Sequence, residues 1–94
     1  MTEQEIYHEV IKKFGINNQI IQLFEELAEL QKAICKEQRY QTKNYDLILD
    51  EIVDVQIMLN QMKIIFNLSD DIIKKHTTMK LNRLKRYINN ETIN

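Results

Sequence analysis

Proline is absent from this sequence, and glycine occurs once, at Gly15. Both residues end helices and form tight turns, so their scarcity argues against a sheet-rich fold built on many turns. The 94 residues are 44% hydrophobic and 29% charged, which is typical of a helical globular protein. We therefore expect a single all-α domain over residues 1–94.

Cysteine and an excess of either charge are also scarce. The one cysteine, Cys35, excludes an intrachain disulfide and fits a reducing cytosol, and we expect it to be buried and inert. The formal net charge of −1 creates no field that attracts nucleic acid or anionic membranes. The chain begins without a signal peptide pattern and has no apolar run long enough to span a membrane. These absences predict a cytoplasmic protein without a membrane or nucleic-acid partner.

Capping signals in the first half of the chain predict two helices. Thr2 followed by Glu5 matches a capping box, and Gly15 is the expected end of the first helix. Either Asn17 or Asn18 is suited to cap the second helix. We therefore expect a short connection between the two helices.

The second half of the chain predicts two more helices. Residues 38–44 are polar and lack helical periodicity, so we expect a loop there, with Asn44 capping a third helix over about 45–67. Ser69, followed by two aspartates, caps the fourth helix. The tail, 89–94, has little to pack against and is expected to fray.

The third predicted helix is apolar around nearly its whole circumference. Its apolar residues are Leu47, Ile48, Leu49, Ile52, Val53, Val55, Ile57, Met58, Leu59, Met62, Ile64, Ile65 and Phe66. A helix of this kind is buried on all sides. Four helices of one chain cover only part of such a helix, so we expect a second chain to cover the rest. The sequence thus predicts a homo-oligomer.

Two acidic pairs lie within these apolar helices, Glu26 with Glu29 and Glu51 with Asp54. Residues three apart share one face of a helix, so each pair directs two carboxylates the same way. Carboxylates grouped in apolar surroundings repel one another and lose hydration unless something compensates them. A divalent cation bound between two antiparallel helices would do so. The alternative is an ion-pair network with Lys and Arg of the fourth helix.

The two pairs face each other only if they lie at similar heights along the helices. If the second helix runs to Tyr40, the first pair lies about 18 Å from that end at 1.5 Å per residue, while the second pair lies roughly half as far from Tyr45. We therefore expect the second helix to end near residues 35–37, or the connection to fold back.

The donor set indicates which metal would bind. All the donors are oxygens, with no His or Cys beside them, which favours Mg²⁺, with Mn²⁺ as a substitute, over Zn²⁺. Mg²⁺ held by carboxylates neutralises phosphate charge and orients a nucleophilic water. The basic side of the fourth helix is then a candidate phosphate clamp, or else an ordinary solvated surface.

Two segments of the sequence carry a family resemblance. EELAE at 25–29 and EIVD at 51–54 resemble the EExxE…ExxD signature of the MazG-like all-α nucleoside triphosphate pyrophosphohydrolases. Chain length and expected helix order are similar to those of the short single-domain members, so the resemblance covers most of 17–87. The segment KLNRLKRY at 80–87 resembles the family's Lys/Asn/Arg segment, which contacts the nucleotide phosphates.

The resemblance implies a four-helix MazG-like bundle, assembled as a dimer or tetramer with substrate pockets where subunits meet. It also implies attack of water on the α-phosphorus of an NTP or dNTP, giving the monophosphate and pyrophosphate. The alternative function is a non-catalytic helical interaction module, in which the acids pair with Lys80, Arg83 and Arg86.

The resemblance assigns roles to individual residues in three groups. The Mg²⁺ ligands and catalytic residues would be Glu26, Glu29, Glu51 and Asp54. Glu25 would be an accessory acid. The phosphate contacts would be Lys80, Asn82, Arg83 and Arg86.

Overall fold

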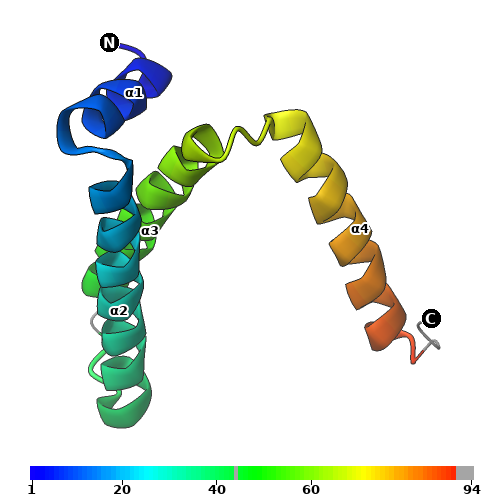
Figure 1. Ribbon diagram of the computed structural model, residues 1–94. Coiled ribbons are helices and arrows are strands. Elements are labelled where there is room, and N and C mark those ends of the chain that lie inside the picture. The colour runs from blue at the N-terminus through cyan, green and yellow to red at the C-terminus, as the bar shows by residue number, and fades with distance from the viewer. Residues whose placement is uncertain (44, 91–94) are drawn as a thin grey trace.

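The computed structural model describes residues 1–43 and 45–90, which form four helices joined by short connections (Figure 1). The helices are α1 (Glu3–Phe14), α2 (Ile16–Tyr40), α3 (Tyr45–Ile65) and α4 (Asp70–Ile88). The described part of the chain contains no strand. The expectation of an all-α fold with four helices is therefore confirmed.

Two predicted helix caps are present. At α1, the Glu5 N–H donates to Thr2 Oγ1 at 3.1 Å, and the Thr2 N–H donates to Glu5 Oε1 at 3.4 Å, which completes the capping box. At α4, Ser69 Oγ accepts a hydrogen bond from the Ile72 N–H at 3.2 Å. Local sequence signals thus define the starts of these helices.

Gly15 joins α1 to α2 without a separate loop. Its φ of 92° is accessible to glycine but strained for other residues. The Gly15 carbonyl accepts from the Gln19 N–H at 3.1 Å, so α2 begins at once. The expectation that Asn17 or Asn18 caps α2 is therefore wrong. Both lie in its first turn, and the Asn18 side chain donates to the Phe14 carbonyl at 2.7 Å instead.

The core lies between α2 and α3, which pack antiparallel, with α1 across one end (Figure 1). Tyr7 ties α1 to this pair, because its hydroxyl accepts a hydrogen bond from Asn60 Nδ2 at 3.1 Å and donates to Glu3 Oε1 at 2.6 Å. The buried residues are Tyr7, Gln19, Ala33, Val55, Met58, Gln61 and Met62. This core is small for a chain of 94 residues.

Only one side of α3 is covered within the chain. Val55 and Met58 face α2 and are buried, whereas Leu49 is 58% exposed on the opposite side. The expectation that Cys35 is buried is wrong: its thiol is exposed. Cys35 lies on the side of α2 turned away from α3, which no other described helix covers.

α4 extends away from the other three helices (Figure 1). Within the described residues it packs against none of them, and Ile73 is its one residue that is not exposed. A four-helix bundle therefore does not close within a single chain, because three helices pack together and the fourth stands apart.

Two further expectations concern residues outside the described part of the chain. The predicted cap Asn44 and residues 91–94 of the predicted fraying tail lie outside them. In the part of the chain that is described, no helix has the length and apolar character needed to cross a membrane.

Candidate metal centre

The connection between α2 and α3 sets the register of the acidic pairs. α2 runs to Tyr40, so of the two expected alternatives an end near residues 35–37 is wrong, and a connection that folds back is confirmed. The chain folds back instead: the Lys43 N–H donates to Glu37 Oε1 at 2.9 Å, and Thr42 Oγ1 donates to Glu37 Oε2 at 2.7 Å. α3 therefore starts about one turn back along α2, which brings the two acidic pairs to similar heights.

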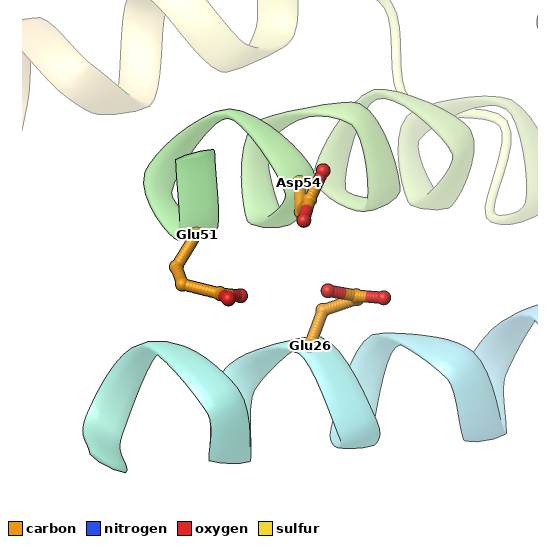
Figure 2. Close-up of side chains that lie close together, drawn as sticks. All are labelled: Glu26, Glu51 and Asp54. Atoms are coloured by element: carbon orange, nitrogen blue, oxygen red, sulfur yellow. The ribbon is translucent and has the colours of Figure 1, made fainter. Parts of the chain in front are cut away.

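Three carboxylates meet between the two helices. Figure 2 shows Glu26 on one helix and Glu51 and Asp54 on the other, with their side chains directed toward the space between them. One oxygen from each lies within 4.8 Å of the others. Glu26 and Glu51 are partly buried, and Asp54 is exposed. The cluster is thus open to solvent on one side.

Glu29 and Glu25, also singled out from the sequence, are not members of this cluster. Both are exposed. Glu29 lines a small pocket together with Glu51, so it lies beside the cluster. The structure therefore brings together three of the four predicted ligands.

The electrostatics at Glu51 record the crowding of negative charge. Burial raises the pKa of its carboxyl above the ordinary value, and the carboxylates of Asp54, Glu29, Glu26 and Asp50 raise it further. A bound cation reverses this effect, because it favours the ionised form of each ligand.

In the part of the chain that the structure describes, no salt bridge compensates the carboxylates of the cluster. Among the described residues, the one salt bridge joins Lys63 Nζ to Asp70 Oδ1 at 4.0 Å, far from the acids in sequence. The predicted phosphate contacts are all exposed on α4, which packs against no other described helix. They are Lys80, Asn82, Arg83 and Arg86. The alternative ion-pair network with α4 is therefore not formed inside a single chain.

The donor set fits a hard divalent cation. All three donors are carboxylate oxygens, the ligand type that Mg²⁺ and Mn²⁺ prefer. In an octahedral Mg²⁺ site, neighbouring ligands lie about 3 Å apart and opposite ligands about 4.2 Å apart, whereas the three oxygens lie within 4.8 Å of one another, so they would move closer together around a bound ion.

Sequence reasoning missed three polar neighbours of the acids. Gln22 Nε2 donates to Glu26 Oε1 at 2.8 Å, and Lys32 and Lys36 line the pocket shared by Glu29 and Glu51. The signal was present as helical spacing, since Gln22 precedes Glu26 by four residues, and the lysines follow Glu29 by three and seven.

Comparisons with protein-family models, curated proteins and solved structures gave no match for this chain. The question of function therefore depends on the acidic motifs and on the geometry that the fold gives them.

Proposed function

We propose that this chain is a MazG-like, Mg²⁺-dependent nucleoside triphosphate pyrophosphohydrolase, which hydrolyses an NTP or dNTP at the α-phosphorus to the monophosphate and pyrophosphate. One observation supports the proposal most directly. A carboxylate oxygen of Glu26, from the first acidic motif, lies within 4.8 Å of carboxylate oxygens of Glu51 and Asp54, from the second. Two motifs far apart in the sequence thus supply one set of oxygen donors.

Glu26, Glu51 and Asp54 would hold the Mg²⁺, for which Mn²⁺ is a substitute. When bound, the ion neutralises charge on the phosphates and lowers the pKa of a coordinated water. The side-chain amide of Gln22 donates to Glu26 and fixes the orientation of that carboxylate, as outer hydrogen bonds do at metal sites generally.

The residues around the cluster complete the chemistry. Glu29 lies beside Glu51 without belonging to the cluster, so its carboxylate is free to accept a hydrogen bond from the attacking water. Lys32 and Lys36 line the same pocket and offer positive charge to the phosphate oxygens. Positioning and electrostatics then supply the catalysis, without a covalent nucleophile.

The basic residues of α4 contribute only if another chain brings them to the site. Within one chain, Lys80, Asn82, Arg83 and Arg86 lie on a helix that packs against no other described helix. Their proposed role as phosphate contacts therefore requires the homo-oligomer, a dimer or tetramer, that the apolar character of α3 favours.

A turnover screen with Mg²⁺ across NTPs and dNTPs, with pyrophosphate and orthophosphate assayed separately, tests this function. We expect pyrophosphate release, and Glu51→Gln should reduce it on the order of a hundredfold or more, since even outer residues of metal sites cost 10–100-fold. Glu9→Gln, which removes an exposed acid of α1, is the matched control and should keep wild-type turnover.

Two results would overturn the proposal. Release of orthophosphate alone would exclude attack at the α-phosphorus. No turnover of any nucleotide, together with no stabilisation by Mg²⁺, would favour the non-catalytic interaction module.

A further inference from the structure

A single chain exposes more surface than a compact protein of its mass. Its accessible surface is 7970 Å², whereas a compact monomer of 11.4 kDa exposes about 5,800 Å². Its Cα radius of gyration is 16.9 Å, against about 12 Å for a compact domain of this length. The excess over a compact monomer, about 4,300 Å² for two chains, falls within the range of about 2,000–5,000 Å² that obligate dimers bury.

α4 supplies much of this uncovered surface on one of its sides. At helical spacing, Ile72, Met79 and Leu84 share one half of its circumference, and they are 48%, 61% and 54% exposed. Lys80 and Arg83 lie on the same half, between the apolar residues. The docking face of α4 is therefore apolar with two cations within it.

The outer face of α3, turned away from α2, has complementary character. Leu49 and Val53 are exposed there, and the exposed Asp46 and Asp50 lie beside them at helical spacing. Asp46 and Asp50 give this face two negative charges, opposite in sign to Lys80 and Arg83 on the docking face of α4. The two faces match in both apolar surface and charge.

The connection between α3 and α4 holds α4 away from the α3 of its own chain. The Leu68 N–H donates to the Lys63 carbonyl at 2.8 Å, and Asn67 adopts a left-handed conformation with φ 55°, which completes the end of α3. Ser69 then caps α4, and Lys63 reaches Asp70 across the connection at 4.0 Å. These contacts define the short connection from which α4 leaves α3.

We infer that α4 is an exchanged arm, which docks its apolar face on the outer face of α3 in a second copy of this chain, while the second copy returns the same contact. Lys80 and Arg83 then lie against Asp46 and Asp50 across the two-fold interface. Such an isologous contact closes as a dimer and covers the side of α3 that no helix of its own chain covers. In this dimer Lys80 and Arg83 would face the outer side of α3, which leaves Asn82 and Arg86 as the residues of α4 available to contact phosphate. The inference itself does not depend on nucleotide hydrolysis.

Charge-swapped variants separate exchange between chains from closure within one chain. One variant carries Lys80→Glu and Arg83→Glu, and the other carries Asp46→Lys and Asp50→Lys. Each alone places like charges across the contact, so the dimer Kd from sedimentation equilibrium should rise on the order of a hundredfold. Mixing the two variants restores opposite charges at both contacts. The heterodimer should therefore form with about the wild-type Kd.

A matched control changes the charge of α4 equally on its opposite side, through Lys74→Glu with Lys85→Glu, and should leave the dimer Kd within a few-fold of wild type. Circular dichroism of each variant shows whether its helices are retained. A wild-type chain that stays monomeric, or a dimer that neither swap weakens, would overturn the inference. So would a mixture of folded variants that fails to associate, which is the result that closure of α4 within its own chain predicts.

Discussion

The α2–α3 pair and α4 differ in how much of their apolar surface one chain covers. Met58 of α3 is 5% exposed, whereas Met79 of α4 is 61% exposed. The sequence predicts both α3 and α4 as helices. Among the described residues, however, of these two only α3 packs against other helices of its own chain. Capping and helical periodicity are therefore enough to form a helix. Burial of its apolar side also requires a neighbouring helix, and the connections determine whether one lies beside it.

The two methionines give the largest test of this comparison. Met58→Ala removes a buried side chain and should lower the free energy of unfolding by about 2–5 kcal/mol. Met79→Ala, measured by urea unfolding at a dilution where the chain is monomeric, should change it by less than about 0.5 kcal/mol. If the two substitutions lowered the free energy of unfolding of the monomer equally, α4 would have to be packed as closely as α3. A loss of stability from Met79→Ala that appears only at higher protein concentration would show that this side chain is buried between chains.

Metal binding should stabilise the α2–α3 pair selectively. At a Mg²⁺ concentration of 100 Kd, a site present only in the folded state adds about 2.7 kcal/mol, which raises Tm by roughly 10–20 °C for a domain of this size. Glu51→Gln should abolish this shift, and Glu9→Gln should preserve it. Amide exchange should slow in α2 and α3 but not in α4. Protection that extends equally to α4 would place the ion elsewhere.

The helix caps provide an intermediate test. Thr2→Ala and Ser69→Ala each remove a cap that contributes about 1 kcal/mol. Because Tyr7 ties α1 to α3, the loss of Thr2 should appear in the unfolding of the whole packed unit. The loss of Ser69, measured in the dilute monomer by amide exchange, should appear only as faster exchange in α4. A loss of global stability from Ser69→Ala would show that α4 is coupled to the core.

The pH dependence of stability is the smallest expected effect. The pKa of Glu51 is raised in the folded chain, first by burial and then by neighbouring carboxylates. Its stabilising contribution is therefore present below the ordinary glutamate pKa of about 4.3 and is lost as the pH rises through the raised value. Without metal, wild type should lose Tm relative to Glu51→Gln over this interval. A difference between the two proteins that is constant with pH would contradict the raised pKa.

The candidate site was partly predictable from the sequence. The three-residue spacing of Glu51 and Asp54 placed them on one face, and both join the cluster. Glu29 shares the same spacing with Glu26 yet lies outside it, because the rotation of α2 against α3 is set by packing and not by spacing. The sequence did not distinguish Lys32 and Lys36 from other surface lysines. Their place beside Glu51, in the same pocket, is known only from the structure.

The helical class, the caps of α1 and α4, and the placement of each acidic pair on one helix face follow from the amino-acid sequence, because each depends on interactions within a few residues. The register of α2 against α3 and the direction in which α4 leaves α3 could be known only from the tertiary structure. The first depends on hydrogen bonds from the connection back to Glu37. The second depends on how the end of α3 and the start of α4 are capped together. Both are set by the geometry of short connections, which periodicity does not encode.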